Sequence, residues 1–144
     1  MLNLSEEQVK EISEQIDCGF RCFIHRQTGE LIVVPDTLRN PDMDTYAWAD
    51  QQEKLDNNFH EYFEIDQLES RDSFEIMVEF TEQLDDKIKI KSDLIKSLNK
   101  KKPFREFNFV IHNSGIYRQQ WFDFKNEKLK MWVMDRLKYL TDLE

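Results

Sequence analysis

The stretch from Lys100 to Leu140 constrains the fold more than any other part of this chain. It holds nine aromatic residues, two of the three tryptophans and the only proline beyond residue 41. Aromatic side chains bury large apolar areas, so a segment this rich in them must pack against a core. The spacing of its apolar residues predicts three helices, and we therefore expect the C-terminal half of the chain to be helical.

The first of these helices begins at Pro103. Proline suits the first helical position because its φ is fixed and it has no N–H that needs a partner. Gly115 is placed to end the helix, since glycine adopts the left-handed conformation without a steric cost. The apolar face that the spacing predicts for this helix consists of Phe104, Phe107, Val110 and Ile111.

The other two helices are predicted on either side of a break near Asn126. The second helix carries a stripe of Tyr117, Trp121 and Phe124, and an unbroken helix would add Lys125 and Lys128 to that stripe. Asn126 is a favourable cap, and Glu127 places a negative charge in the first turn of a new helix. The apolar face predicted for the third helix consists of Leu129, Trp132, Val133, Leu137 and Leu140.

The first half of the chain combines helices with short strands. The segment 5–8, Ser-Glu-Glu-Gln, is a capping box that predicts a helix ending before Gly19. The apolar runs 20–25 and 31–34 flank a turn with Gly29 and predict a β-hairpin. The alternation over 59–65 predicts a third strand, with Phe63 and Ile65 on one face and Tyr62 and Glu64 on the other.

Three more helices are predicted between and after these strands. Asp42 or Asp44 is placed to cap a short helix that contains Tyr46 and Trp48. Ser70 or Asp72 is placed to cap another helix, whose apolar stripe consists of Phe74, Met77, Val78, Thr81 and Leu84. A further helix continues to Leu98, although the alternation over 87–91 leaves a strand as the alternative there.

Together these elements predict an α+β fold. The hairpin and the third strand form a small antiparallel sheet, and about six helices cover it, because a sheet of three strands is marginally stable alone. At 144 residues, one domain over 1–144 is expected, with a helix, hairpin and strand part at 1–66 and a helical part at 70–144.

The C-terminal motif resembles an uncharacterised bacterial protein family of the UPF series. It reads F-R-x-F, followed by R-x-x-W-F-x-F, with T-G-E at the hairpin turn and M-x-x-F in an upstream helix. The resemblance implies no activity and no site. The positions that carry it are Phe104, Arg105, Phe107, Arg118, Trp121, Phe122, Phe124, Thr28, Gly29, Glu30, Met77 and Phe80.

Catalytic and cofactor motifs are excluded by composition and spacing. None of the phosphate-binding or nucleophile-elbow motifs occurs, since the three glycines of the chain, at positions 19, 29 and 115, lie too far apart to form one. The string His60-Glu61-x-x-Glu64 lacks the second histidine of a zinc helix, and His25 and His112 lie far apart in sequence. We therefore predict no catalytic residue, no cofactor and no metal, and an enzyme ranks as the third hypothesis.

The two cysteines, Cys18 and Cys22, are expected to be free. If both lie on one strand they are separated by about 13 Å, beyond the reach of a disulfide. The apolar runs are too short for a membrane span, and the N-terminus lacks the basic and apolar regions of a signal peptide. We therefore expect a cytoplasmic protein that does not contact a membrane.

Charge is distributed unevenly along the chain. The net charge is −9, yet the basic segment 87–105 carries eight lysines and arginines against Asp93 alone. The acidic stretch 42–75 carries eleven carboxylates against two basic residues. The basic segment is thus either a contact surface for an anionic partner or a solvated face that the acidic stretch neutralises.

We therefore predict a non-catalytic binding or regulatory module with a protein partner. The candidate contact residues are Lys100, Lys101, Lys102 and Arg105, which lie at a helix entrance rather than on an apolar face. A nucleic-acid-associated regulator using 87–105 is the alternative, because phosphate is favoured at a helix N-terminus. The negative net charge of the chain disfavours that alternative. No oligomeric state is predicted.

Overall fold

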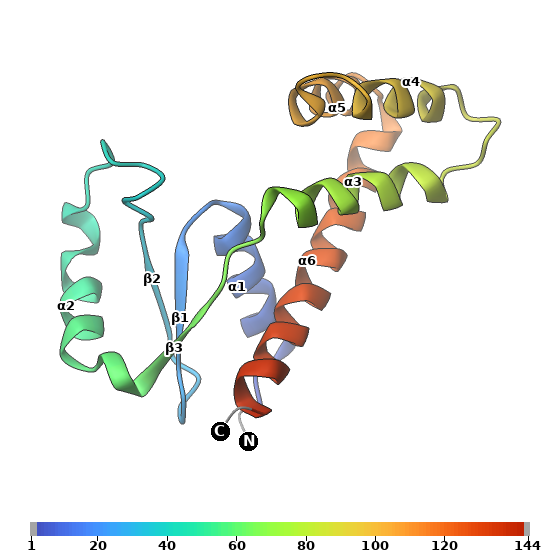
Figure 1. The fold of residues 1–144 in the computed structure, drawn as a ribbon. Coiled ribbons are helices and arrows are strands. Elements are labelled where there is room, and N and C mark those ends of the chain that lie inside the picture. Colours follow the sequence, from blue (N-terminus) through green and yellow to red (C-terminus); the bar gives the residue numbers. More distant parts are fainter. Residues whose placement is uncertain (1–2, 143–144) are drawn as a thin grey trace. The chain divides into compact units, whose positions relative to one another are not determined.

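The computed structural model describes residues 3–142, which divide into two compact units. Unit 1 is formed by Met1–Gln67 together with Leu129–Glu144, and unit 2 by Leu68–Lys128. Within the described residues the chain has three strands, all in unit 1, and six α-helices (Figure 1). The α+β fold, the small antiparallel sheet and the helical C-terminal half are confirmed.

The sheet of unit 1 has the strand order β2-β1-β3, and both pairings are antiparallel. Phe23 on the central strand pairs with Ile32 on one side and Glu64 on the other. Gly29 has a φ of 76° in the turn between β1 and β2, where any other residue would be strained. This confirms the predicted hairpin. The bounds are β1 (Arg21–His25), β2 (Leu31–Val34) and β3 (Tyr62–Ile65).

Both faces of this sheet are buried, which explains why its strands are apolar on both sides. Helix α1 (Glu6–Asp17) lies against β1, on the side where Cys22 and Ile24 are buried. Helix α2 (Ala49–Asn57) covers the other face through Leu55. The side chains that pack with Leu55 there are Phe23, Ile32, Val34 and Tyr62.

Local signals set the start and the end of α1 as predicted. The N–H of Gln8 donates to Oγ of Ser5 at 3.1 Å, and the N–H of Ser5 donates to Oε1 of Gln8 at 2.7 Å. These bonds satisfy two donors that a helix start leaves without partners. Gly19, with a φ of 89°, follows the helix end. Cys18 is the C-cap of α1 and does not lie on a strand with Cys22, so that assumption was wrong.

Several predicted bounds in the first half need correction. The run 59–65 is a 3-10 turn, η2 (Phe59–Glu61), followed by the short strand β3, because the N–H of Tyr62 bonds locally to the carbonyl of Phe59. The predicted assignment of side chains to two alternating faces is therefore correct only within β3. The helix expected before Ala49 is a 3-10 turn, η1 (Tyr46–Trp48), and α2 continues through residues too polar to predict, where Leu55 alone is buried.

Unit 2 is a helical unit with one apolar core. Trp121 lies between Phe80 and Phe107, with ring centroids 5.3 Å and 4.9 Å away. The N-cap of helix α3 is Glu69, and the helix begins at the next residue. The carboxylate of Asp72 accepts the N–H of Glu69 at 3.2 Å. The prediction of Ser70 or Asp72 as the cap was therefore wrong, since both residues lie within the helix. The helices of this unit are α3 (Ser70–Gln83), α4 (Lys89–Leu98), α5 (Pro103–His112) and the first part of α6 (Ile116–Asp142).

Helix α6 (Ile116–Asp142) runs without a break, so the predicted interruption at Asn126 was wrong. The two lysines that suggested the break are accommodated on the helix. Lys125 places its ammonium 5.4 Å from the centre of the Phe122 ring, and Lys128 lies 5.5 Å from the centre of Phe124. Long lysine stems cover apolar surface while the charge stays in a polar environment, which is why a lysine in an apolar stripe need not end a helix.

Among residues 3–142, no helix has both the length and the apolar character that crossing a bilayer requires.

Candidate functional site

The basic segment 87–105 spans helix α4, the turn after it and the start of α5. Lys101 and Lys102 are exposed in the turn. Lys100 lies 3.7 Å from a carboxylate oxygen of Glu106, and Arg105 donates to the same carboxylate at 3.1 Å. Exposed ion pairs contribute little stability, so these cations remain accessible to a partner.

One lysine of the segment differs from the others. The side chain of Lys91 is only 15% exposed, and its ammonium donates to the carbonyl of Leu84 and to Asp86. This lysine therefore has a structural role between α3 and α4. The other basic side chains of the segment lie on exposed residues: Lys87, Lys89, Lys96, Lys100, Lys101, Lys102 and Arg105.

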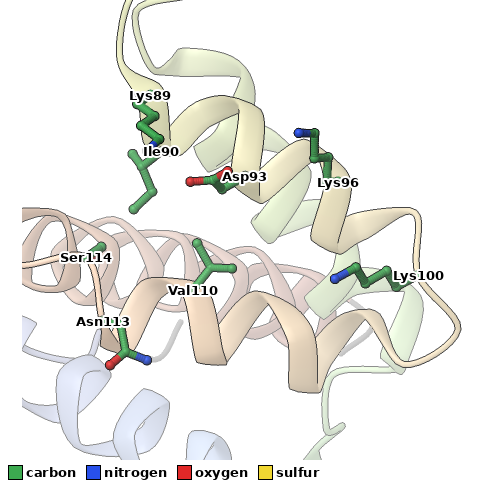
Figure 2. Close-up of a pocket in the computed structure, with 8 residues that line it drawn as sticks. All are labelled: Lys89, Ile90, Asp93, Lys96, Lys100, Val110, Asn113 and Ser114. Atoms are coloured by element: carbon green, nitrogen blue, oxygen red, sulfur yellow. The ribbon is translucent and has the colours of Figure 1, made fainter.

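A groove of about 430 Å³ lies between α4 and α5, and we call it the α4–α5 groove (Figure 2). Its charged wall is formed by Lys89, Asp93 and Lys96, which lie on one face of α4 at intervals of four and three residues, together with Lys100 in the turn after the helix. The α5 wall is uncharged. The lining residues are Lys89, Ile90, Asp93, Lys96, Lys100, Val110, Asn113 and Ser114.

The groove has a positive electrostatic character. Lys89, Lys96 and Lys100 outnumber Asp93, and Lys89 and Lys96 make no side-chain hydrogen bond or ion pair within the described residues. Ammonium groups on flexible stems attract anions without demanding one geometry. The groove can therefore hold an extended or helical segment that carries several carboxylates or phosphates.

Of the four predicted contact residues, the groove includes Lys100 alone. Lys101, Lys102 and Arg105 are exposed beside it but do not line it. The sequence prediction missed Lys89 and Lys96 as contact residues, although both belong to the basic segment. Lys89 and Lys96 are seven residues apart, a helical periodicity that identifies their shared face on α4.

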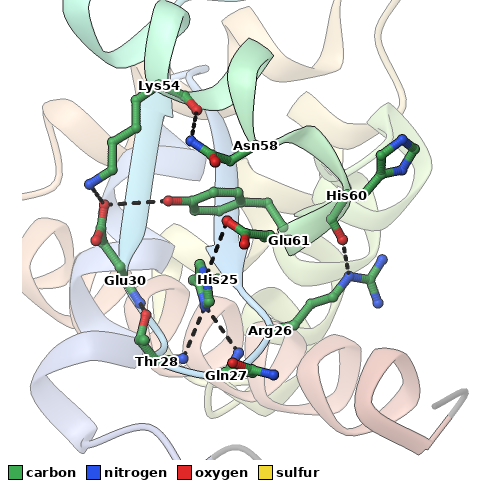
Figure 3. Close-up of polar contacts among 10 residues, drawn as sticks. His25, Arg26, Gln27, Thr28, Glu30, Lys54, Asn58, His60 and Glu61 are labelled. Atoms are coloured by element: carbon green, nitrogen blue, oxygen red, sulfur yellow. Dashed lines mark hydrogen bonds and ion pairs between the residues drawn. The ribbon is translucent and has the colours of Figure 1, made fainter.

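A second polar cluster lies at the hairpin turn of unit 1 (Figure 3). Nδ1 of His25 accepts the backbone N–H groups of Gln27 and Thr28, both at 3.1 Å. Neutral imidazole with an accepting Nδ1 carries its proton on Nε2, which lies 3.8 Å from Glu61. The imidazole thus holds the turn together, and its accepting nitrogen is already occupied.

The neighbouring charges of this cluster are also paired. Lys54 of α2 contacts Glu30 after the turn, and the Tyr62 hydroxyl lies 3.5 Å from the same carboxylate. The hydrogen bond from Lys54 lowers the pKa of Glu30, and the same bond raises the pKa of Lys54. Burial is the main cause of the raised pKa of Tyr62. These contacts fix α2 to the hairpin.

The string His60-Glu61-x-x-Glu64 is arranged for structure rather than for metal binding. Both oxygens of Glu64 accept from Arg21 at 2.9 Å, which raises the pKa of that guanidinium. His60 belongs to the turn η2, and its carbonyl accepts from Arg26 at 3.1 Å. No group of three or more potential metal ligands is clustered among residues 3–142.

A second hollow, of about 730 Å³, lies in unit 1 beside α2. Asp44, Glu53 and Asp56 line it, together with Trp48, whose ring is 5.6 Å from that of Phe20. Arg21 also lines it but is engaged by Glu64. The surface beside α2 is therefore acidic, opposite in sign to the α4–α5 groove.

Comparison with known proteins identifies the family. A family model described as uncharacterised protein family UPF0158 matches residues 2–142. The UPF0158 protein PA5073 of Pseudomonas aeruginosa is 22% identical over 130 residues, which cover 90% of this chain and 79% of that protein. No solved structure matches. The resemblance to a UPF-series family is confirmed, and the chain belongs to the uncharacterised protein family UPF0158.

Proposed function

We propose that this protein is a non-catalytic binding module that holds an acidic segment of a partner protein in the α4–α5 groove. The observation that carries the proposal is the row of Lys89, Lys96 and Lys100 along one wall of the groove. Three ammonium groups along one wall of the groove favour a ligand with several negative charges in a row.

The fold gives no reason of its own for this row. Lys89 and Lys96 have no ionic partner within the described residues, and Lys100 has one exposed contact with Glu106. Lys89 also lies in the first turn of α4, where positive charge is unfavourable by a few tenths of a kcal/mol. Binding of an anionic partner explains the presence of these three lysines, which the stability of the fold does not explain.

An acidic protein segment fits better than a nucleic acid. The net charge of −9 repels a long polyanion more strongly than a short segment with few charges, because the repulsion grows with the charge of the ligand. A nucleic acid remains the second candidate because Lys100, Lys101 and Lys102 directly precede the N-terminus of α5, where phosphate is favoured. The free thiols Cys18 and Cys22 suit a reducing compartment, which supports the cytoplasm as the place of action.

The direct test is fluorescence anisotropy with two labelled probes, a polyglutamate peptide and a single-stranded DNA oligonucleotide. We expect the peptide to bind more tightly, and its affinity to fall between about 0.05 M and about 0.3 M salt. Replacing the three groove lysines by glutamate should weaken peptide binding by about tenfold or more. That variant is Lys89→Glu/Lys96→Glu/Lys100→Glu.

A matched variant separates the groove from net charge. It reverses three exposed cations outside the groove and so changes the total charge equally: Lys10→Glu/Arg71→Glu/Lys138→Glu. Retained peptide binding in this variant supports the groove. Equal loss in both variants contradicts the proposal, and tighter binding of the oligonucleotide favours the nucleic-acid alternative.

A further inference from the structure

Helix α2 presents an acidic face to solvent. Asp50, Glu53 and Asp56 are exposed on it at three-residue intervals, on the side away from the buried Leu55. The only cation of this helix, Lys54, is paired with Glu30 of the hairpin. The face therefore keeps its negative charge, and Glu53 and Asp56 also line the acidic hollow of unit 1.

The spacing of this acidic face matches that of the α4–α5 groove. Asp50 and Asp56 are separated by six residues, or about 9 Å along a helix. Lys89 and Lys96 are separated by seven residues, or about 10.5 Å, and flexible lysine stems take up the difference. A helix with the charge pattern of α2 is thus a ligand of the kind that the groove selects.

We infer that the acidic face of α2 from a second copy of this chain occupies the α4–α5 groove. This inference rests on the proposed function and names the partner. The contact is heterologous, since the two surfaces differ, so a pair of copies retains one unused groove and one unused α2, and assembly proceeds head to tail.

The association is expected to be weak and sensitive to salt. Each copy carries a net charge of −9, which opposes approach, while the complementary faces attract only within a Debye length of about 10 Å at 0.1 M salt. Raising the salt to about 1 M shortens that length to about 3 Å and should abolish the contact. Sedimentation velocity of the full chain at both salt concentrations measures this directly.

Two variants isolate a single contact. Lys89→Gln/Lys96→Gln removes the groove charges, and Asp50→Asn/Asp56→Asn removes those of α2. Each variant alone should remain monomeric at about 0.1 M salt, where the parent associates. Their mixture should form a one-to-one pair and no larger species, because one intact α2 and one intact groove remain.

A control with the same charge change tests specificity. Lys10→Gln/Lys138→Gln alters two exposed lysines outside the groove and should associate as the parent does. A parent that stays monomeric at both salt concentrations overturns the inference, as does association retained by Lys89→Gln/Lys96→Gln. If polyglutamate still binds the groove of a monomeric parent, only the second copy as partner is refuted; if it does not bind, the proposed function fails as well.

Discussion

The ammonium of Lys91 donates a hydrogen bond to the carbonyl oxygen of Leu84 at 2.8 Å. The same nitrogen lies 2.7 Å from Asp86 and 3.3 Å from the carbonyl oxygen of Glu82. Carbonyl groups at the end of a helix lack partners within it, so this lysine satisfies the end of α3 from the start of α4. The contact lowers the pKa of Asp86, chiefly through its hydrogen bond with Lys91.

Replacing Lys91 by methionine should therefore lower the free energy of unfolding by about 1–3 kcal/mol, since hydrogen bonds from a charged donor are lost while the apolar stem is kept. Urea denaturation measures the change. Lys89→Met is the matched control on the same helix, and its effect should stay within about 0.5 kcal/mol, because that side chain is exposed. Equal effects of the two substitutions would contradict a structural role for Lys91.

The two tryptophans of α6 should differ in their contribution to stability. Trp121 is buried between Phe80 and Phe107, so Trp121→Ala should cost about 3–5 kcal/mol. The sequence pattern predicts the same cost for Trp132, but Trp132 is only half-buried, with Arg136 5.6 Å from its ring centre. We therefore expect about 1–3 kcal/mol for Trp132→Ala. Denaturant midpoints measure the two losses, and a larger loss of stability for Trp132→Ala than for Trp121→Ala would contradict this order.

The two thiols should react differently in the folded protein. Cys18 is exposed, whereas Cys22 is fully buried in β1, and burial is the main cause that raises its pKa to about 12. A thiol-reactive dye should label one cysteine per native chain at pH 8 and two after unfolding. Cys18→Ser should abolish the native labelling. Rapid labelling of Cys22 in native Cys18→Ser would show that β1 opens readily.

The same thiol predicts a loss of stability at alkaline pH. As the pH rises from about 9, the Cys22 thiol ionises in the unfolded chain but stays protonated in the folded one, because its folded pKa is about 12. The free energy of unfolding should therefore fall between these values. Cys22→Ala removes this contribution, so its stability should depend less on pH over that range. If the stability of the parent and that of Cys22→Ala depended on pH in the same way, the result would argue against a buried thiol.

The three lysines of the turn between α4 and α5 should not be needed for stability. Replacing Lys100, Lys101 and Lys102 by glutamate should leave the melting temperature equal or slightly higher, because negative charge is favoured near the N-terminus of α5. The exposed contact between Lys100 and Glu106 is too weak to offset this. Thermal unfolding followed by circular dichroism is the measurement. A triple variant that melts well below the parent would favour neutralisation of these lysines by the protein itself.

The candidate site was only partly predictable from the sequence. The charge of segment 87–105 is visible in the sequence, and Lys100 does line the groove. The importance of Lys89 and Lys96 depends on which face of α4 meets α5, and charge counting does not reveal that face. Lys91 looks equivalent to its neighbours in sequence, but its side chain lies against the end of α3.

The sequence alone determined the features that depend on residues close together in the chain. The capping box of Ser5 and Gln8, the hairpin turn at Gly29 and the start of α5 at Pro103 follow from local hydrogen bonds and allowed φ values. The apolar periodicity likewise placed Phe107 in the core.

The tertiary structure decided the rest, and α6 is the clearest case. Asn126 favours a helix start in isolation, yet the helix passes through it. Lys128 bonds to Glu79 of α3 at 2.8 Å and lies over Phe124, and these contacts make a lysine acceptable where periodicity predicts an interruption. Packing between residues distant in sequence outweighs a local preference of about 1 kcal/mol, and only the folded chain brings those residues together.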